Sequence, residues 1–443
     1  MIDELQILWH YARARYRPVP RSRRDLEAWQ AKRFQAFARR TLSRSPFYAP
    51  YVGRPLEDYP VIDKSRMVAD FDTMNTRKLR REAILDLALA SERSRDFKPL
   101  LHGISVGLSS GTSGNRGLFA VSPTERRLYV GAILAKCLPG SILRRYRIAL
   151  LLRANNTLYE EASKGGRISY RFFDLVRPIG DICADLDAYQ PDIIIGPPQS
   201  LRLVAEAQAA GRLAIKPVKI ISSAEVLDDI DRRRIGAVFG RPIDQIYQAT
   251  EGFLGAACRH GTIHLNEDFI HVEKRWIDRA SGRFMPIVTD FTRCTQPIVR
   301  YRLDDILVAR DTPCPCGSIH LGIARIEGRF DDILAAPSRT HDRLVPIMPD
   351  FIRDALAHAH DVIADYRIIQ RDPAHIDIQL SSPEPSHAFA IAQQRLAAAI
   401  GRFDVLMPAF RNLGAIETSA LRKVRRVERR FPVKLEDLWP ASS

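Results

Sequence analysis

Three short apolar runs in the first half of the chain constrain its fold more than any other feature of the sequence. They cover 147–152 (RIALLL), 192–195 (DIII) and 218–221 (VKII), and their length and composition are typical of strands buried on both faces. A stretch with helical spacing, 199–210, lies between the second and the third run. Strands that alternate with helices predict an α/β core with parallel pairing.

The sequence pattern changes twice further along the chain. From about residue 245 the apolar segments become short, which predicts a β-rich subregion. From about residue 331 the expected order is helix, strand, strand, helix and strand, at 349–360, 366–371, 376–380, 386–400 and 409–417. That order predicts a small α+β domain. We therefore expect a large N-terminal domain of mixed sheets flanked by helices over 1–330, and a small, mobile C-terminal domain over 331–443.

The charge of the chain is strongly positive. Its 443 residues include 67 Lys and Arg against 52 Asp and Glu, a net charge of +15. Such an excess attracts nucleic acids, membranes or nucleotides, but no nucleic-acid-binding motif accompanies it, so we interpret it as solvated helix faces and expect no nucleic-acid partner. No apolar run reaches the about 18 residues that span a bilayer, and no secretory signal is recognisable, so we expect a cytoplasmic protein.

A loop rich in glycine and hydroxyl groups is the most informative local segment. It lies within 106–121 (VGLSSGTSGNRGLFAV) and contains Ser109, Ser110, Gly111, Thr112, Ser113 and Gly114. Glycines let backbone N–H groups approach an anion, and hydroxyls add further donors, so the loop favours phosphate binding. It lacks the Gly-Lys-Ser/Thr ending of a Walker sequence, and a flexible surface turn is the alternative interpretation.

Four further segments follow the loop: 222–225 (SSAE), 247–251 (YQATE), 300–305 (RYRLDD) and 327–332 (EGRFDD). Together with the loop they resemble the motifs of the adenylate-forming enzymes, which include acyl-CoA synthetases, adenylation domains and luciferases. Within that superfamily the chain is similar to the phenylacetate–CoA ligase branch, and most of all to the synthetases that adenylylate a deazaflavin coenzyme.

The resemblance implies a binding site for ATP and Mg²⁺. The Ser/Thr/Gly loop would hold the β- and γ-phosphates, while Ser223, Ala224 and Glu225 would line the adenine pocket. Tyr247 would stack near the adenine. The binding of adenine and phosphates would then come from segments that lie far apart in the sequence.

The same resemblance assigns roles to the polar residues of the later motifs. Thr250 would contact the α-phosphate, and Glu251 would hold Mg²⁺, a hard cation that prefers carboxylate oxygens. Asp305 would accept hydrogen bonds from both ribose hydroxyls, as a carboxylate can, and Arg329 would also bind the ribose. Asp304, beside Asp305, leaves some ambiguity over which of the two carboxylates takes this part.

The family pattern also implies a hinge and a mobile lysine. Asp331 matches the hinge between the two domains. Lys423 matches the lysine that reaches the α-phosphate, where a flexible ammonium can neutralise developing charge. The alternative for Lys423 is a basic helix face, because Arg422, Arg425 and Arg426 surround it.

Four Cys and His residues suggest a structural zinc site. Cys314 and Cys316 stand in a Pro/Gly turn, and Cys258 and His264 follow the YQATE segment. Two cysteines in a turn with a distant Cys and His could complete a tetrahedral site, with His260 as the alternative fourth ligand. The spacing differs from that of a zinc finger or ribbon, so ordinary reduced thiols are the other interpretation.

Taken together, the motifs imply an AMP-forming ligase. We expect ATP-dependent adenylation of an acidic, aromatic small molecule to an acyl-AMP, with its pocket drawn from about 129–175. The activated group would pass to CoA, an amine or a carrier; the segment from residue 334 lacks the Arg-Gly turn usual in the CoA ligases of this branch, which leaves CoA uncertain. Two alternatives stay open: adenylyl transfer to a phenolic or phosphate oxygen of a cofactor, and a non-catalytic basic protein that binds nucleotides or nucleic acid. The sequence does not give the oligomeric state.

Overall fold

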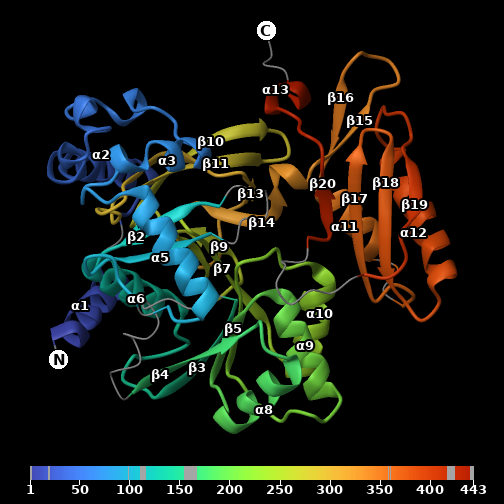
Figure 1. Ribbon diagram of the computed structural model, residues 1–443, viewed down its shortest axis with the longest axis horizontal. Helices are drawn as coiled ribbons and strands as arrows, with labels where there is room; N and C mark the ends of the chain where they lie inside the picture. Colours follow the sequence, from blue (N-terminus) through green and yellow to red (C-terminus); the bar gives the residue numbers. More distant parts are fainter. Residues whose placement is uncertain are drawn as a thin grey trace.

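The computed structural model describes residues 2–17, 20–97, 99–109, 116–153, 167–357, 359, 361–416 and 425–439. These residues form a larger N-terminal part and a smaller C-terminal part that lie side by side (Figure 1). A sheet of 12 strands runs through the larger part, and a four-stranded sheet forms the centre of the smaller part. The architecture confirms the expected α/β fold with a smaller C-terminal α+β domain. The division at residue 330 stays a prediction.

The parallel half of the large sheet contains the three apolar runs. Its order is β4-β3-β5-β6-β7. The strands are β3 (Tyr146–Leu152), β4 (Ile168–Asp174), β5 (Ile193–Gly196), β6 (Lys219–Ser222) and β7 (Ile243–Ala249), and the helices that connect them are α8 (Ile179–Tyr189), α9 (Pro198–Ala209) and α10 (Asp229–Phe239). Ile148 and Leu150 belong to one apolar cluster, and Ala149 and Leu151 to another, so β3 is buried on both faces as predicted.

From β7 onward the sheet continues with antiparallel pairs. Its further strands are β8 (Gly252–Ala257), β9 (Ile263–Leu265), β14 (Gly322–Arg329), β13 (Asp305–Ala309), β11 (Arg283–Asp290) and β10 (Ile270–Asp278), with β12 (Ile298–Arg302) paired to β11. This half confirms the predicted β-rich subregion. Strand β14, which carries the EGR motif, was not predicted from the sequence.

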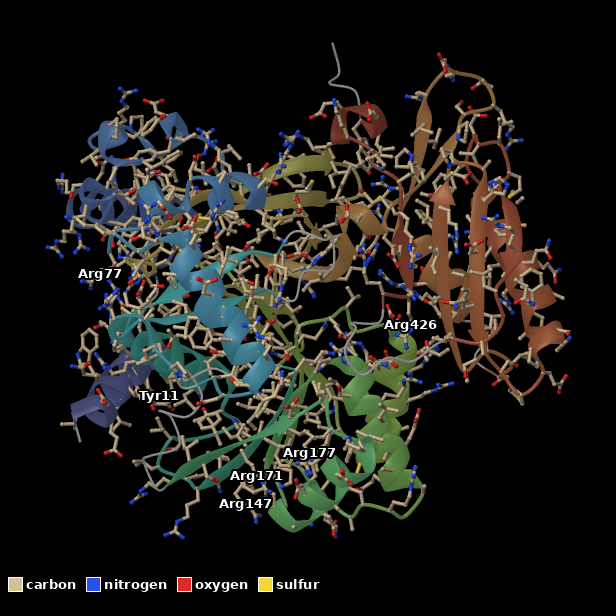
Figure 2. The ribbon with its side chains drawn as sticks, viewed as in Figure 1. Tyr11, Arg77, Arg147, Arg171, Arg177 and Arg426 are labelled. Carbon is tan, nitrogen blue, oxygen red and sulfur yellow. The ribbon has the colours of Figure 1, made fainter. Side chains whose placement is uncertain are left out.

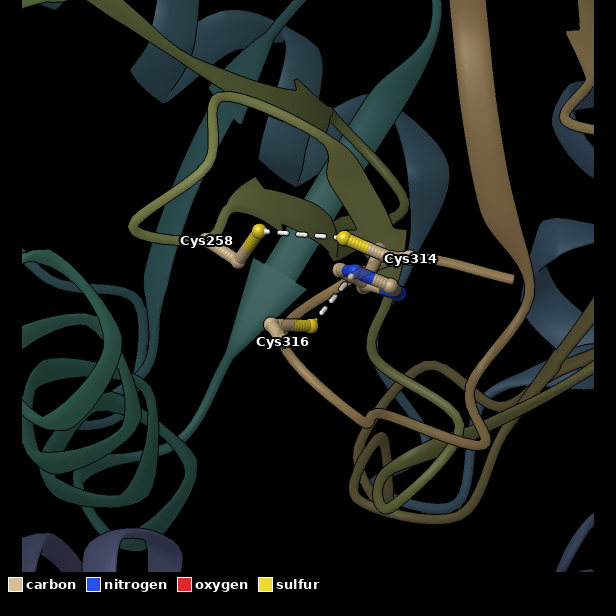
Figure 3. A group of neighbouring side chains, drawn as sticks. Cys258, Cys314 and Cys316 are labelled. Carbon is tan, nitrogen blue, oxygen red and sulfur yellow. Dashed lines mark hydrogen bonds between the residues drawn. The ribbon is translucent and has the colours of Figure 1, made fainter. Parts of the chain in front are cut away.

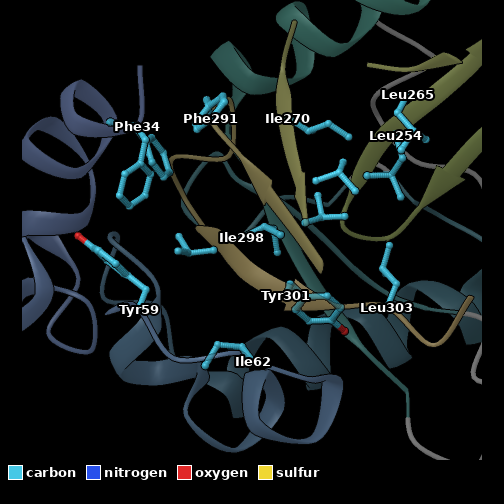
Figure 4. Close-up of a cluster of buried hydrophobic side chains, with 14 of the residues drawn as sticks. Phe34, Tyr59, Ile62, Leu254, Leu265, Ile270, Phe291, Ile298, Tyr301 and Leu303 are labelled. Carbon is cyan, nitrogen blue, oxygen red and sulfur yellow. The ribbon is translucent and has the colours of Figure 1, made fainter. Parts of the chain in front are cut away.

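N-terminal helices cover the β-rich half. They are α2 (Arg23–Arg40), η1 (Leu42–Arg44), η2 (Ala49–Tyr51), η3 (Leu56–Asp58), α3 (Lys64–Ala69) and α4 (Phe71–Met74). Their apolar side chains join those of the strands in one cluster (Figure 4). In this cluster Phe34 comes from α2, Tyr59 and Ile62 from the connection between η3 and α3, and Ile298 and Tyr301 from β12. The packing fixes α3 beside the strand end that bears Tyr301.

Helix α6 (Pro123–Cys137) links the two halves of the large sheet. It follows the hairpin of β1 (Ser105–Leu108) and β2 (Leu118–Val121), against which α5 (Arg81–Ser94) packs. The helix begins with a capping box of Ser122 and Glu125. The Glu125 carboxylate also accepts hydrogen bonds from the backbone N–H groups of Cys294 (2.6 Å) and Thr295 (2.9 Å), which fixes the start of α6 against the β-rich half.

Helix α1 (Ile2–Tyr16) packs along α6. At Gly131 on α6, an added Cβ would lie 2.8 Å from the carbonyl oxygen of Ile7, so no side chain fits between the two helices at that point.

The smaller part follows a short helical turn, η5 (Phe330–Asp332). Its elements are β15 (Leu334–Pro337), β16 (Leu344–Ile347), α11 (Pro349–Ala357), β17 (Asp365–Asp372), β18 (His375–Ser381), α12 (Pro385–Ile400), β19 (Ala409–Asn412), β20 (Val427–Arg429) and α13 (Leu435–Leu438). The sheet order is β19-β18-β17-β20, with β20 parallel to β17. The predicted strand 409–417 is too long, because β19 ends at Asn412 before a turn at Gly414.

Within the described ranges, every helix is too short or too polar to cross a bilayer.

Candidate active site

A cavity of about 480 Å³ lies between the large sheet and the smaller part. Ten of the residues assigned from the sequence line it: Ser109, Ser223, Ala224, Glu225, Tyr247, Thr250, Glu251, Asp305, Arg329 and Asp331. Ser110, Gly111, Thr112, Ser113, Gly114 and Lys423 lie outside the described residues. The structure therefore brings five separate sequence segments to one cavity.

The position of the cavity follows from the direction of the parallel strands. Ser223 comes directly after β6, and Thr250 comes directly after β7. Because parallel strands share a carboxyl edge, residues that follow them meet at that edge, where α/β sheets bind their ligands. Ala224 adopts a left-handed backbone conformation there, with φ of +67°, a strained state for a residue with a side chain.

Asp305 is oriented by two neighbours. The Tyr247 hydroxyl donates a hydrogen bond of 2.7 Å to Asp305 Oδ2, and Arg329 Nε lies 3.4 Å from Asp305 Oδ1. Asp305 and Arg329 are direct partners in the antiparallel pairing of β13 with β14. The neighbouring Asp304 also lines the cavity, but its side chain is exposed. The geometry thus favours Asp305 over Asp304 as the residue with a fixed carboxylate.

Glu251 is held by a second tyrosine. Burial raises the pKa of Glu251, while a hydrogen bond with the Tyr301 side chain and the charge of Lys64 act in the opposite direction. Lys64 lines the same cavity, together with Ser109. Lys64 was not identified from the sequence. Asp63 caps α3 by accepting a hydrogen bond from the Arg66 N–H group (2.9 Å), but nothing in the Asp-Lys-Ser segment pointed to a distant glutamate.

Glu225, which lines the cavity, forms an ion pair with Arg153. Arg153, which follows β3, donates a hydrogen bond of 3.0 Å from Nη1 to Glu225 Oε1. This pair joins the end of β3 to the turn after β6, across the end of β5, which lies between these two strands.

An apolar wall lies next to these polar groups. Ile148, Leu150 and Leu152, alternate residues of β3, line it, together with Tyr129 of α6 and Tyr170 of β4. Between 128 and 138 and between 148 and 152, the lining residues carry no charged side chain. This part of the cavity suits an uncharged, apolar group.

The region 129–175, from which the pocket was expected to be drawn, contributes aromatic residues both to the cavity and to the core. Tyr129 and Tyr170 line the cavity, while Tyr146 and Phe173 are buried in the apolar clusters. Tyr159 lies outside the described residues.

The four Cys and His residues come together at a second place. The ligand atoms of Cys258, His264, Cys314 and Cys316 all lie within 4.8 Å of one another (Figure 3). Cys258 Sγ is 3.7 Å from Cys314 Sγ, and Cys316 Sγ is 3.3 Å from His264 Nε2. His260 is not part of this group; its backbone N–H instead points to the Cys258 sulfur at 3.4 Å.

The geometry of this cluster suits a tetrahedral metal ion. Zinc–sulfur bonds of about 2.3 Å place two thiolates of a tetrahedron roughly 3.8 Å apart, close to the observed separation. His264 Nδ1 lies 3.1 Å from the carbonyl oxygen of His320, which leaves Nε2 to face the sulfurs. Hydrogen bonds with the Thr262 side chain and the Cys316 backbone lower the pKa of Cys314 to about 5, which favours its thiolate, whereas burial and the neighbouring thiols raise the pKa of Cys316 to about 11. None of the four residues lines the large cavity.

Comparison with known proteins relates the sequence and the fold to those of AMP-forming ligases. No protein-family profile matches the chain. Its sequence is 22% identical, over 216 residues, to a phenylacetate–coenzyme A ligase from Thermus thermophilus; the match covers 44% of this chain and 46% of that ligase. The chain is thus matched to less than half the length of that relative.

Solved structures extend the similarity to nearly the whole chain. The 2-hydroxyisobutyryl-CoA ligase in its postadenylation state, in complex with 2-HIB-AMP, superposes with a TM-score of 0.69 at 18% identity, covering 94% of this chain and 91% of that one. For the same ligase in its thioesterification state the TM-score is 0.51, with the same coverage. The amide bond synthetase McbA from Marinactinospora thermotolerans gives 0.52 at 13% identity, covering 74% and 68%.

The protein has the fold of the adenylate-forming ligases. Its sequence is similar to part of a phenylacetate–coenzyme A ligase, in agreement with the resemblance to that branch drawn from the motifs, while the likeness to the deazaflavin synthetases stays a prediction.

Proposed function

We propose that the chain is an ATP-dependent, AMP-forming ligase that converts a carboxylic acid into an acyl-AMP. The observation that carries the proposal is the shared cavity: the predicted adenine, ribose, phosphate and Mg²⁺ residues that the structure describes all line it. The similarity to a CoA ligase and to the fold of an amide bond synthetase supports the same reaction class. ATP is the substrate that such a set of residues would bind.

In the proposed reaction a carboxylate oxygen of the acid attacks the α-phosphorus of ATP. The bond from that phosphorus to the bridging oxygen breaks, and pyrophosphate leaves with the electron pair. Asp305 accepts hydrogen bonds from the ribose hydroxyls, while Tyr247 and Arg329 keep its carboxylate in place. Such a site accelerates the step through positioning and electrostatic stabilisation.

We assign Thr250 and Glu251, which both line the cavity, to the α-phosphate and the Mg²⁺ ion. A Mg²⁺ ion on Glu251 would neutralise charge on the phosphate oxygens. Lys64 and Ser109 line the cavity on the same side, and Lys64 adds a positive charge for the β- and γ-phosphates. We assign the loop 109–114 to those phosphates, and Lys423 to the α-phosphate during the transfer.

We propose an acid with an uncharged, planar or apolar body as the substrate. The cavity wall beside Glu251 consists of Tyr129, Phe253 and other apolar side chains, and the rings of these two residues lie 6.2 Å apart. Aromatic rings favour such neighbours in edge-to-face contact. Aromatic monocarboxylic acids are therefore the first class to test, and CoA, an amine or a carrier would accept the acyl group.

A second proposal concerns Cys258, His264, Cys314 and Cys316, which would hold a structural zinc ion. Three thiolates and one imidazole are ligands that zinc prefers, and His264 already has an orienting partner. The ion would join the turn after β8 and strand β9 to the loop between β13 and β14. Strands β13 and β14 carry Asp305 and Arg329, so the metal would support the ribose site from a distance.

The exchange of labelled pyrophosphate into ATP tests the proposed activity. The panel contains phenylacetate, benzoate, 4-hydroxybenzoate, 2-hydroxyisobutyrate and octanoate, each with Mg²⁺. Exchange that depends on one of these acids and is lost in Asp305→Ala supports the proposal. Exchange with none of them, together with retention of the protein on nucleic acid at moderate salt, would support the basic binding protein instead.

A further inference from the structure

A buried group of charged side chains joins the larger part to the smaller part. Its members from the larger part are Arg202, Asp228 and Asp231, and those from the smaller part are Arg353, Asp365 and Arg426. We refer to these six residues as the interdomain ion cluster. The side chains of all six residues are largely buried. None of the six was assigned a role from the sequence.

Arg426 is the centre of the interdomain ion cluster. Its Nη1 lies 2.6 Å from Asp228 Oδ2 and 2.6 Å from Asp231 Oδ2, and its Nη2 lies 3.2 Å from Asp231 Oδ1. On its own side of the boundary, Nε donates to Asp365 Oδ1 at 2.8 Å. Figure 2 shows Arg426 between the two parts, beside α10. One guanidinium thus fixes the start of β20 to the N-terminal end of α10.

Two further arginines complete the charge balance. Arg202 reaches Asp365 (2.7 Å) and Asp231 (3.2 Å), and Arg353 reaches Asp228 (3.1 Å). One arginine and two aspartates give the larger part a local charge of −1, and two arginines and one aspartate give the smaller part +1. The two halves of the cluster are therefore complementary in charge.

The burial of the interdomain ion cluster determines how it affects the arrangement of the two parts. Buried ion pairs gain little net stability, because both charges lose their hydration, but a single unpaired charge left behind is costly. Separation of the two parts would return water to both halves of the cluster. The cluster therefore selects one relative arrangement of the two parts without making that arrangement irreversible.

The selected arrangement places the smaller part over the cavity. Asp228, Asp231, Arg353, Asp365 and Arg426 line the cavity, as does Arg425, which also pairs with Asp332 beside the assigned hinge. In the sequence, Arg426 is the third residue after Lys423. The chain also superposes better on the postadenylation state of the 2-hydroxyisobutyryl-CoA ligase than on its thioesterification state.

We propose that Arg426 is a positioning residue, which through Asp228 and Asp231 holds the smaller part in the arrangement used for adenylate formation. The catalytic consequence rests on the proposed ligase function; the structural consequence does not. The loss of Arg426 should shift the population toward separated parts and lower the rate of adenylation, while the ATP-binding residues of the larger part remain in place.

Small-angle X-ray scattering of the full chain without ligand tests the structural half. Arg426→Gln should increase the radius of gyration relative to the wild type. Arg371→Gln is the matched control, because Arg371 pairs with Asp377 inside the small sheet, and it should leave the scattering unchanged. If Arg426→Gln does not fold, Asp231→Asn takes its place, since it removes one charge and retains a hydrogen-bond acceptor. Scattering identical to the wild type in the variant that folds would overturn the proposal.

Pyrophosphate exchange with phenylacetate, or with the best acid of the panel, tests the catalytic half. Arg426→Gln should lower kcat by about tenfold or more, in line with the cost of an unpaired buried charge, with a small change in KM for ATP. Arg426→Lys should restore part of the rate. A rise in KM alone, or a kcat equal to that of Arg371→Gln, would contradict the positioning role. If no acid supports exchange in the wild type, the ligase function fails, while the scattering result still decides the interdomain ion cluster.

Discussion

Tyr247 donates a 2.7 Å hydrogen bond to Asp305, and this contact joins two motifs separated by 58 residues in the sequence. Tyr247 lies in β7 and Asp305 at the start of β13, so the bond fixes the parallel half of the sheet to the β-rich half at the cavity. Burial and the neighbouring Asp305 raise the pKa of Tyr247 well above its usual value, so the hydroxyl remains a donor. A carboxylate oriented in this way is prepared to accept hydrogen bonds from a sugar.

The first prediction concerns this carboxylate. Asp305→Asn should raise KM for ATP by about 10- to 100-fold, because a hydrogen bond to a charged group contributes about 1.5–3 kcal/mol. Asp304→Asn, one residue away and exposed, is the control and should change KM by less than about threefold. Steady-state exchange kinetics at varied ATP measure both. Equal changes in KM for ATP in the two variants would contradict the assignment of the ribose site to Asp305 rather than Asp304.

The second prediction separates stability from function at Glu251. Its pKa is raised by burial, so the folded state binds a proton more tightly than the unfolded state does. Stability linked to this group is therefore present below the ordinary carboxyl pKa and falls as the pH rises through the raised value. Glu251→Gln removes that loss. At pH 7 the melting temperature of this variant should be higher than that of the wild type, and near pH 4 the difference should disappear. The variant should also have little adenylation activity.

Thermal unfolding at the two pH values checks the sign of this effect. Glu82→Gln, an exposed change on α5, should leave the melting temperature almost unchanged at both. A Glu251→Gln variant less stable than the wild type at pH 7 would mean that Tyr301 and Lys64 outweigh the cost of burial.

A third prediction concerns the Cys/His cluster. The purified protein should contain one zinc ion per chain, and Cys314→Ser should lower both the zinc content and the melting temperature, because metal binding contributes to folding. KM for ATP should rise as well, since the cluster supports β13 and β14. Cys294→Ser, outside the cluster, should retain the metal. If elemental analysis finds no zinc in wild-type protein from cells grown with added zinc, the proposed metal site is contradicted.

Gly328 offers a fourth prediction. Its φ of +129° is unfavourable for any residue with a side chain, and an added Cβ would lie 2.5 Å from Asp332 Oδ2. Gly328→Ala should lower the free energy of unfolding by about 1–3 kcal/mol from strain alone. It should also displace Asp332 from Arg425. Gly211→Ala, with φ of +69° but open space around it, carries the strain without the clash. Chemical denaturation of both variants should show a clearly larger loss at Gly328.

The sequence predicted the parallel half of the fold well, for a physical reason. The segments 147–152 and 192–195 are apolar throughout or nearly so, and burial on both faces requires this. Strand β14 was not predicted for two reasons. Register shifts at Ile306/Leu307 and Val308/Ala309 interrupt the alternation of inward and outward side chains where it pairs with β13. In addition, Arg325 and Glu327 pair with each other within the strand. Its irregular pattern did not resemble a strand.

The candidate site shows the same contrast. Motif residues such as Ser223 and Thr250 were identifiable because they belong to short contiguous segments, SSAE and YQATE, that resemble motifs of the adenylate-forming enzymes. Lys64 and Arg426 were not, because their partners lie far away: Arg426 contacts Asp228, 198 positions earlier, and the local sequence shows only a basic segment. Side chains that act through tertiary contacts produce no motif of fixed spacing in the local sequence.

The location of a bound nucleotide tests the central claim most directly. Crystals of the protein soaked with Mg²⁺ and a non-hydrolysable ATP analogue should show the ribose hydroxyls at Asp305, the adenine beside Ala224 and the phosphates between Ser109 and Glu251. An analogue bound at another surface, or a cavity without nucleotide at millimolar concentrations of the analogue, would contradict the account.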